Sequence, residues 1–519
     1  MDVAEFGSVA QRLESPGERG KADRVTGLLL IHGEDSVAVA TTELLPGTQL
    51  ELEGQTLRLL DAVPAGHKVA RRAHAAGESV IKYGFPIGHA SEAIAPGQHV
   101  HVHNLRTTLT AEADIPFLPA APRPAAGFSR TFRGFRRSDG RAGTRNELWI
   151  IPTVGCVART AEALATRFRA ELAGFPNIDG AQAFSHAFGC SQLGDDLANT
   201  QKILAGLATH PNVGGALVLG LGCENNYLDA FRPFLEGGDA TRLRFLSAQA
   251  SLDEHQDGLA LLAELAERAN QDQRSEISVG ELVVGLKCGG SDGLSGITAN
   301  PLLGRFAERL VASGGTAILT EVPEMFGAEP AFFSRCADER VFERALALVS
   351  GFRRYYVERG QPVYENPSPG NKTGGISTLE EKSLGCVQKG GGAPITDVVA
   401  YGGRASEPGL TLLQGPGNDQ VSTTALVAAG ATLVLFTTGR GTPLGSPVPT
   451  LKVSTNSALF AKKPGWIDFD AGVIAAGAER ESVDRAFFEL VFAVANGKTT
   501  RNEEHGQRDI AIFKDGVTL

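Results

Sequence analysis

The chain has 519 residues, with 49 Lys and Arg against 59 Asp and Glu, a formal net charge of -10. This length exceeds one ordinary core and predicts two to four domains, of which we expect three. The 42% hydrophobic and 21% charged residues are typical of a soluble globular protein. No apolar run approaches the roughly 20 residues that span a bilayer. The acidic balance offers no basic field, so we expect neither a nucleic acid nor a membrane as partner.

Three segments make up the first quarter of the chain. Residues 1–26 mix Glu, Arg, Ser, Gly and Pro without the apolar stretch of a secretory signal, and they predict a disordered tail. From residue 27 to 105, short β-rich pieces alternate with Gly/Pro turns, which indicates a small β-rich domain. A Pro/Ala-rich stretch at 106–130 is expected to be an extended linker.

Apolar strand patterns alternate with helical patterns from residue 131 to the end. This alternation indicates α/β layers around mainly parallel sheets, and we expect two Rossmann-like domains, at 131–275 and 276–519. Several of the strands end in Gly-rich or polar loops, and three of these loops carry Cys156, Cys223 and Cys288. Ligands of open α/β sheets bind outside the carboxyl ends of the strands, so a site is expected there.

The six cysteines stand singly, without close pairs. This spacing predicts reduced thiols in a cytoplasmic protein and fits neither a disulfide framework nor a CxxC zinc site. Cys190 precedes a predicted helix, whose dipole favours the thiolate and so reactivity or metal binding. A buried small hydrophobe is the alternative for any isolated cysteine. Polar neighbours favour the functional interpretation at Cys190 and Cys223, whereas Cys336 is expected to be structural.

Histidines are concentrated in the predicted β-rich domain: His32, His67, His89, His99, His101 and His103. The last three occupy alternate positions, so on a strand they would share one face. Imidazoles on one face could ligate a metal, shuttle protons or bind a carboxylate, but a solvated surface face explains the same spacing without function.

Charged residues beside the strand-end loops are further candidates. Glu321 and Glu324 flank Pro323 and could act as base or ligand, with solvated loop carboxylates as the alternative. Lys372 and Arg440 lie near Gly-rich loops and could hold a substrate carboxylate, although an ordinary surface role is favoured for either one taken alone. The chain has no GxxxxGK[ST] motif and no GxGxxG between a strand and a helix, so we expect no nucleotide cofactor.

Seven runs of sequence closely resemble the altronate/galactarate dehydratase family: 145–149, 184–196, 220–226, 288–293, 320–327, 365–372 and 438–443. The β-rich domain resembles the SAF domain of that family. The resemblance implies a hydro-lyase of hexuronate catabolism that converts D-altronate to 2-dehydro-3-deoxy-D-gluconate. Galactarate or another hydroxy acid is the alternative substrate. The resemblance also implies dependence on Fe²⁺ or Mn²⁺, and we expect a homo-oligomer.

Elimination of water needs a base for the proton beside the carboxylate and help for the departing hydroxide. The predicted catalytic residues are His67, Lys68, His186, Glu321 and Glu324. The predicted substrate-binding residues are Asn104, Asn225, Asn226, Ser291, Asp292, Lys372 and Arg440. The predicted metal ligands are His32, His101, His103, Cys190, Cys223 and Glu224. Such a mixed ligand supply suits Fe²⁺, Mn²⁺ or Zn²⁺ better than Ca²⁺.

Two other interpretations stay open. The chain could be an iron–sulfur lyase in which Cys156, Cys190, Cys223 or Cys288 holds a cluster instead of a single ion. Alternatively, the β-rich domain could be a carbohydrate-binding part of a larger assembly, with the α/β domains as scaffold. The base stays unassigned between the histidines and the two glutamates, Glu321 and Glu324.

Overall fold

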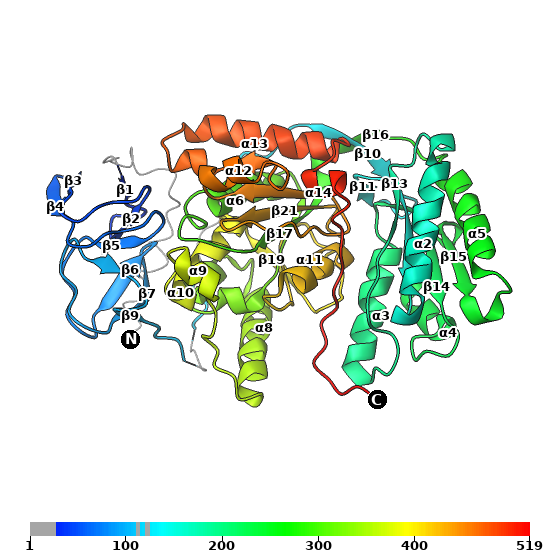
Figure 1. Cartoon of the computed structure of the whole chain (residues 1–519), viewed down its shortest axis with the longest axis horizontal. Coiled ribbons are helices and arrows are strands. Elements are labelled where there is room, and N and C mark those ends of the chain that lie inside the picture. Colours follow the sequence, from blue (N-terminus) through cyan, green and yellow to red (C-terminus); the bar gives the residue numbers. More distant parts are fainter. Residues whose placement is uncertain (1–26, 111–114, 120–124) are drawn as a thin grey trace.

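In the computed structural model, residues 27–110, 115–119 and 125–519 are described (Figure 1). The predicted disordered tail at 1–26 lies outside these ranges, as does part of the predicted linker. A β-rich N-terminal module (residues 27–110) lies at one end of the molecule, a seven-stranded unit (279–519) in the middle and a four-stranded unit (144–274) at the other end (Figure 1). The expected β-rich start and the α/β remainder are both present.

The N-terminal module contains three small antiparallel sheets. The first is β1 (Leu28–Leu29), β2 (Val37–Ala40), β5 (Lys68–Ala70) and β8 (His99–Val100). The others are β3 (Gln49–Leu52) with β4 (Gln55–Arg58), and β6 (Ser79–Lys82) with β7 (Phe85–Ala90) and β9 (Leu105–Arg106). All four residues of β2 are buried, because other parts of the module cover both faces of this strand.

The four-stranded unit is a parallel sheet of order β13-β12-β14-β15. Its strands are β12 (Glu147–Pro152), β13 (Gly180–Ala183), β14 (Val213–Gly220) and β15 (Leu243–Ser247). Successive side chains of a strand point to opposite faces. Leu148 and Ile150 therefore pack with helices α2 (Ala158–Phe168) and α5 (Glu254–Ala269). Trp149 and Ile151 pack with α3 (Gly194–Ala208) on the other face.

The seven-stranded unit is also parallel, with order β19-β20-β18-β17-β21-β22-β23. Its strands are β17 (Val283–Cys288), β18 (Thr316–Leu319), β19 (Ile395–Val399), β20 (Gly409–Leu413), β21 (Leu433–Thr438), β22 (Thr450–Ser454) and β23 (Phe469–Asp470). One face packs against α6 (Ala299–Ala312), α8 (Glu339–Glu358) and α13 (Arg480–Ala495). The other face packs against α11 (Asp419–Ala428).

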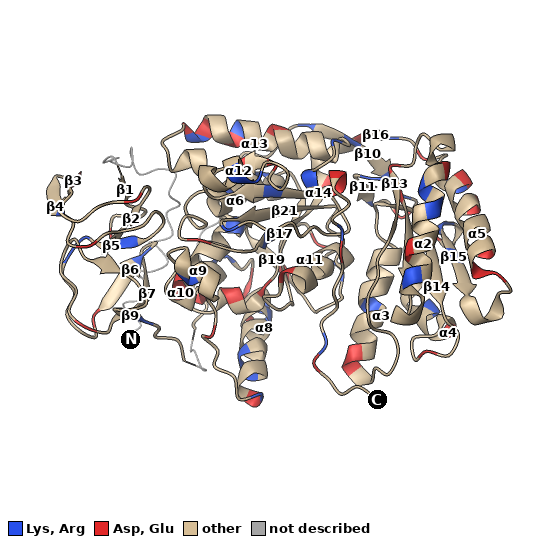
Figure 2. Cartoon of the chain, viewed as in Figure 1, with Lys and Arg blue, Asp and Glu red and all other residues tan. Residues whose placement is uncertain are grey.

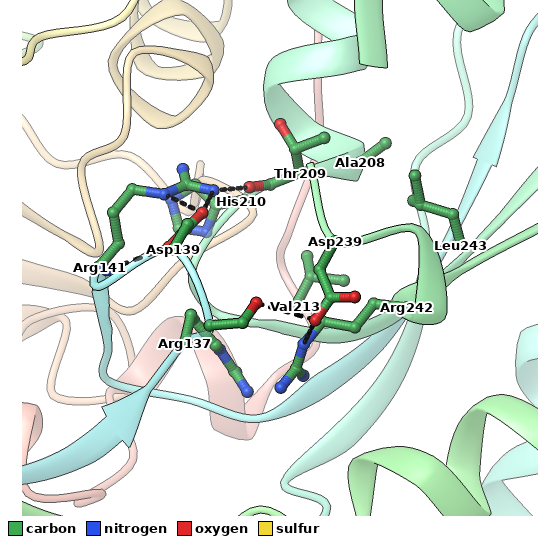
Figure 3. Close-up of a pocket in the computed structure, with 11 residues that line it drawn as sticks. Arg137, Asp139, Arg141, Ala208, Thr209, His210, Val213, Asp239, Arg242 and Leu243 are labelled. Carbon is green, nitrogen blue, oxygen red and sulfur yellow. Dashed lines mark hydrogen bonds and ion pairs between the residues drawn. The ribbon is translucent and has the colours of Figure 1, made fainter. Parts of the chain in front are cut away.

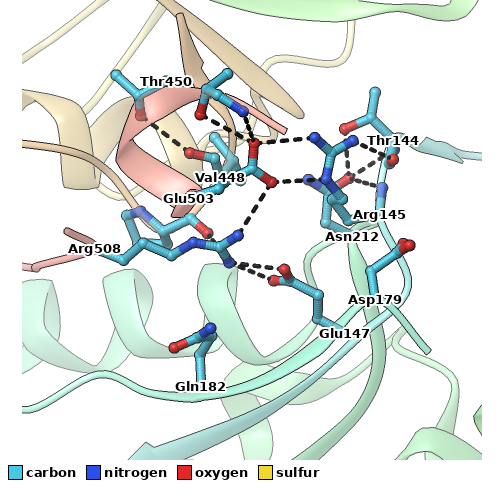
Figure 4. Close-up of polar contacts among 12 residues, drawn as sticks. Thr144, Arg145, Glu147, Asp179, Gln182, Asn212, Val448, Thr450, Glu503 and Arg508 are labelled. Carbon is cyan, nitrogen blue, oxygen red and sulfur yellow. Dashed lines mark hydrogen bonds and ion pairs between the residues drawn. The ribbon is translucent and has the colours of Figure 1, made fainter. Parts of the chain in front are cut away.

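The two α/β units share a core, because α3 and α11 pack against each other within one apolar cluster. A buried ion-pair network joins them as well (Figure 4): Arg508 pairs with Glu147 and Glu503, and Glu503 also pairs with Arg145. A small antiparallel sheet of β10 (Thr131–Arg136), β11 (Ala142–Gly143) and β16 (Ser275–Ser278) links the units at their edge.

The N-terminal module packs on the short helices α9 (Pro369–Thr373) and α10 (Leu379–Cys386) of the seven-stranded unit. One apolar cluster runs from Val80 and Ile87 of the module into Leu379 and Leu384 of α10. At the contact, a Cβ added to Gly293 would lie 1.9 Å from the carbonyl oxygen of Gly66, so the two backbones approach as only glycine allows.

Two long surface helices carry charges of both signs. Acidic and basic side chains alternate along α2 and α13 (Figure 2), so neither helix offers the continuous positive face that nucleic-acid phosphates attract. Within the described residues, no helix has both the length and the apolar character that crossing a membrane requires.

Candidate active site

The strand order of the seven-stranded sheet reverses at β17. From β17 the chain first adds β18 on one side and later β21 on the other, so two loops diverge from neighbouring carboxyl ends. Ligands of open α/β sheets bind at such a switch point. Here the backbone amides of Gly439 and Arg440 donate to the carbonyl oxygen of Gly290, at 3.0 and 2.8 Å. The predicted substrate-binding residues Ser291, Asp292 and Arg440 lie at this switch point.

Asp292 fixes the loops instead of facing a ligand. Its buried carboxylate accepts hydrogen bonds from Thr455 Oγ1, Asn456 Nδ2 and Ser295 Oγ at 2.8 to 3.0 Å. Gly439 packs so closely on this carboxylate that an added Cβ would lie 2.2 Å from Asp292 Cγ. Contact of Asp292 with substrate is therefore not favoured by the geometry, whereas the exposed Arg440 and the half-buried Lys372 can reach an anion.

The histidines of the N-terminal module lie against the segment that follows α9. His67 Nε2 lies 3.2 Å from the Thr373 carbonyl oxygen, and His67 Nδ1 lies 3.0 Å from His99 Nε2. Because a carbonyl oxygen only accepts, His67 Nε2 is the donor and Nδ1 accepts from His99. Both ring nitrogens of His67 are thus occupied.

His101 has a different arrangement. Its Nδ1 lies 2.9 Å from Ser377 Oγ, whereas Nε2 has no hydrogen bond to any described residue. The ring centroids of His99 and His101 are 5.6 Å apart, and those of His99 and His103 are 5.4 Å apart. The expected shared strand face is only partly right: β8 ends at Val100, and Asn104 Oδ1 accepts from the His101 amide to form a turn.

Burial keeps these imidazoles neutral. It lowers the pKa of His99 to about 4 and, together with the nearby Lys68 ammonium, lowers the pKa of His101 to about 3. Burial also lowers the pKa of His67. At neutral pH, His67, His99 and His101 therefore carry a lone pair that can accept a proton or bind a metal.

Lys68 is a buried ammonium with three acceptors. It donates to Gly375 O, Ser377 Oγ and Glu381 Oε2, each at 2.8 or 2.9 Å. The other Glu381 oxygen accepts from Lys82 at 2.8 Å. Burial opposes ionisation of Glu381, yet Lys68 and Lys82 hold the pKa of Glu381 at about 2. Lys68 therefore positions Ser377, and through it His101, instead of acting as a free base.

A second buried charge cluster lies behind the β17 loop. Glu321 pairs with Lys287 and Lys389, and Glu324 pairs with Lys382 at 2.8 Å. Burial and the neighbouring Glu324 carboxylate raise the pKa of Glu321. Glu321 also has a left-handed backbone, with φ 69°, which is uncommon for a non-glycine residue and is found at functional sites.

The same cluster encloses two thiols. Cys386 Sγ donates to Glu324 Oε2 at 3.0 Å, and Cys288 Sγ lies 2.7 Å from Ser291 Oγ. The neighbouring Cys386 thiol and Lys389 ammonium hold the pKa of Cys288 below its usual range. Glu321 and Glu324 are thus brought together beneath the predicted substrate loop, but both are enclosed by cations.

Two known proteins are similar to this chain over almost their whole length. The chain is 50% identical over 494 residues to the altronate dehydratase of Bacillus subtilis (strain 168), covering 94% of this chain and 99% of that protein. It is 50% identical over 490 residues to the altronate dehydratase of Escherichia coli (strain K12), covering 94% and 99%. The chain belongs to the altronate/galactarate dehydratase family.

Family models match nearly all of the described chain. The altronate/galactarate dehydratase SAF domain matches residues 26–108, the D-galactarate dehydratase/altronate hydrolase second domain matches 134–270, and the D-galactarate/altronate dehydratase C-terminal model matches 279–518. A more distant member of the family is the galactarate dehydratase (L-threo-forming) of Escherichia coli (strain K12), 34% identical over 93% of this chain and 96% of that protein. The N-terminal module is therefore the SAF domain of this family.

The structure separates the predicted site residues into three groups. Two of these groups lie at opposite ends of the molecule, and the third, on the seven-stranded unit between them, is Ser291, Asp292, Glu321, Glu324, Lys372 and Arg440. The SAF group, beside the seven-stranded unit, is His32, His67, Lys68, His101, His103 and Asn104. The second group, on the four-stranded unit, is His186, Cys190, Cys223, Glu224, Asn225 and Asn226. A single metal site that combines His32, His101 and His103 with Cys190, Cys223 and Glu224 of the same chain is therefore wrong, because the seven-stranded unit lies between the groups.

The arrangement of possible donor side chains also argues against a site for a single metal ion. Across the described ranges, no group of three or more His, Cys, Asp or Glu side chains is placed to hold a metal ion. The Glu224 carboxylate is already used: it accepts from Thr153 Oγ1 at 2.7 Å and from the Gly222 amide at 2.6 Å. The residues present do not fit one Fe²⁺ or Mn²⁺ ion, and no reaction step is derived through it.

Two further predicted residues have local structural contacts. His186 Nε2 donates to the Pro152 carbonyl oxygen at 2.7 Å, and its Nδ1 accepts from the Phe188 amide, so a catalytic role for His186 is not favoured. Asn104 Nδ2 donates to the His99 carbonyl oxygen at 3.0 Å, so the Asn104 side chain stabilises the turn at His101, and a substrate-binding role for it is not favoured.

The sequence interpretation did not select several residues of the site. The sequence could have indicated a buried role for Lys287, because this lysine lies within an otherwise apolar strand. Lys82, Glu381, Lys382 and Ser377 carried none, because Glu381 and Lys382 lie in a polar stretch that is typical of a solvated helix face.

A small cavity elsewhere does not compete with this site. It has a volume of about 30 Å³ and is lined by Arg137, Arg141, His210, Asp239 and Arg242, among others (Figure 3). Arg137 and Arg242 both pair with Asp272, and Arg141 pairs with Asp139. A space of this size holds about one water molecule, so it offers no room for a sugar acid.

Proposed function

We propose that the chain is a hydro-lyase that converts D-altronate to 2-dehydro-3-deoxy-D-gluconate and water, with galactarate as the second candidate substrate. The altronate dehydratases that are 50% identical over almost their whole length support the substrate. The observation that carries the chemistry is the junction where neutral SAF imidazoles meet the Gly-rich loops at the switch point of the seven-stranded sheet.

The substrate carboxylate is expected to bind at the β17 and β21 loops. The exposed Arg440 and the half-buried Lys372 supply positive charge there. The charge of the carboxylate also offsets Lys68, which otherwise disfavours a protonated His101.

His101 is the base that the geometry favours. In the tautomer whose Nδ1–H donates to Ser377 Oγ, the Nε2 lone pair accepts the C2 proton. The electrons of the C2–H bond form a C2–C3 double bond as the C3–O bond breaks, and the departing hydroxide takes the proton from the His101 imidazolium and leaves as water. The product of this step is an enol with its hydroxyl on C2, which tautomerises to the 2-keto acid.

We also propose a cytoplasmic location, a homo-oligomeric state and, from the family resemblance, dependence on Fe²⁺ or Mn²⁺. We also infer that both α/β units are Rossmann-like, because each has a parallel sheet whose strand order reverses about its first strand.

The deciding experiment is keto-acid formation by the metal-stripped protein with altronate, galactarate or gluconate. Each is assayed without metal and with Fe²⁺ or Mn²⁺ under reducing anaerobic conditions. We expect turnover of altronate, and the comparison of the samples with and without added ion tests the metal dependence that the family resemblance implies. Turnover of galactarate alone would identify galactarate as the substrate in place of altronate. No elimination from any of the acids would favour the carbohydrate-binding interpretation of the β-rich domain.

A further inference from the structure

The four-stranded sheet has a switch point of its own. Its order, β13-β12-β14-β15, places the first strand of the unit between the second and the third. The loops after β12, β13 and β14 therefore leave the same edge of the sheet, where open α/β sheets bind ligands. No residue of these loops has a part in the proposed dehydration.

Each of these three loops carries one cysteine. Cys156 follows β12, Cys190 follows β13 and Cys223 follows β14. All three are exposed, whereas Cys288, Cys336 and Cys386 are buried. Cysteine is among the most frequently buried residue types, so three exposed thiols at one sheet edge are unexpected for a structural role.

Hydrogen bonds hold the three loops together. The Gly155 amide donates to Phe188 O at 2.9 Å, and the Asn226 amide donates to Gly189 O at 3.0 Å. The Ser191 amide donates to Asn225 Oδ1 at 2.8 Å. Each bond lies within three residues of a cysteine, so the three loops that carry the thiols form one compact surface, where Cys223 Sγ accepts a hydrogen bond from Gln249 Nε2 at 3.4 Å.

The backbone at this surface is adapted to close approach. A Cβ added to Gly189 would lie 2.0 Å from the Thr153 carbonyl oxygen, and Gly189 has φ 98°. Ser191 also has a positive φ, 57°. Asn226 is fully buried, and its Oδ1 has no hydrogen-bond partner among the described residues. An orphan buried acceptor indicates a missing donor, such as water bound to an added group.

We propose that Cys156, Cys190 and Cys223 hold an iron–sulfur cluster of the four-iron type at this edge. Each thiol gives up its proton, and each sulfur binds a different iron, so the thiolates need not converge on one point as ligands of a single ion do. That difference accounts for the absence of a single-ion site within the described ranges. Three thiolates leave one iron without a cysteine, able to bind water or another oxygen ligand.

This assignment separates Cys288 from the other candidates, because Cys288 lies on the other sheet beside Cys386. The proposal stands independently of the dehydratase proposal, since it concerns cofactor content and not substrate.

The test is anaerobic reconstitution of the full chain with a ferric salt, sulfide and a thiol reductant, which together supply the ferric and ferrous iron of a four-iron cluster, followed by removal of unbound iron. We expect about four iron and about four acid-labile sulfide per chain, a brown colour with broad visible absorbance, and an electron paramagnetic resonance signal after reduction. Cys156→Ala, Cys190→Ala and Cys223→Ala should each lose at least half of the sulfide. Cys336→Ala, buried on the other unit, is the matched control and should keep all of it.

A second readout does not depend on cluster yield. Before reconstitution, a thiol reagent should modify the three exposed cysteines of the native chain, and after reconstitution these three should be protected. Iron bound without sulfide, zinc in place of iron, or full sulfide in the triple variant would overturn the proposal. Keto-acid formation is measured separately on the same samples, so failure of the cluster and failure of the dehydratase function are distinguishable.

Discussion

His101 shows how residues far apart in the chain prepare one side chain for proton transfer. Ser377 orients its ring, Lys68 holds Ser377, and burial keeps the imidazole neutral. The histidine-rich sequence predicts the chemical type of this group. It does not predict which imidazole retains a nitrogen without a protein partner, because that depends on contacts to residues about 276 positions later in the chain.

Replacing His101 with Gln tests its role directly. The amide can still bond to Ser377 but takes up no proton, so we expect kcat to fall by roughly 10²- to 10⁴-fold, the usual contribution of a general base. His103→Gln, at the exposed end of the same segment, is the control and should keep most of its activity. Steady-state keto-acid kinetics measure both, and equal losses would place the base elsewhere.

The neutral histidines also make stability depend on pH. The folded pKa values of His99 and His101, about 4 and about 3, lie below the unfolded value of about 6.5. As pH falls below about 6.5, the unfolded chain binds protons first. The contribution of neutral His99 and His101 to the stability of the folded chain is therefore complete above about pH 6.5, and it is lost as the pH falls toward 4.

Denaturant midpoints between pH 8 and pH 4 measure this loss. We expect the wild-type midpoint to decrease on acidification, and the midpoint of His101→Gln to decrease less steeply, because one titrating group is gone. Parallel curves for the two proteins would mean that His101 titrates alike in the folded and unfolded states.

At the scale of elements, α10 connects the SAF domain to the seven-stranded unit. All eight of its residues are buried, including Glu380, Glu381 and Lys382. The acidic first turn and the capping Thr378 are consistent with a helix start. The sequence alone suggests a solvated helix, because the surface that covers it comes from strands about 300 residues earlier.

Two matched substitutions on α10 measure what the buried charges contribute. Glu381→Gln leaves Lys68 and Lys82 without a carboxylate, so we expect a loss of about 3–5 kcal/mol in unfolding free energy. Glu380→Gln is the control, because Glu380 accepts only from Thr107 and the Thr108 amide and hydroxyl, which an amide oxygen partly replaces. Urea unfolding compares them, and equal losses would show that the ion pairs add nothing specific.

At the scale of the whole molecule, the order of strand and helix patterns predicts α/β units after a β-rich start, and the structure confirms this. It does not predict that the two sheets place their switch points on separate parts of the molecule. His101 and Cys190, both predicted as metal ligands, lie on different units for that reason, and the linear sequence does not show this separation.

Substitutions in the ion network of Figure 4 test how far each α/β unit depends on the other for its stability. Arg508→Met leaves the buried Glu147 and Glu503 with fewer cations, so we expect a loss of about 3–5 kcal/mol in unfolding free energy. Arg359→Met removes a more exposed pair with Asp515 and should cost at most about 1 kcal/mol. Calorimetry of both variants checks this, and similar shifts would argue against the network as the joint between the units.

The contact of Gly66 with Gly293 limits how this protein can be recombined. Any side chain at position 293 would collide with the backbone of the SAF domain, so the two surfaces match only as a pair. A chimera that takes its SAF domain from one relative and the remainder from another should assemble where both parents have glycine at these positions. Replacing Gly293 even with alanine would push the SAF histidines away from the loops of the seven-stranded unit that they face.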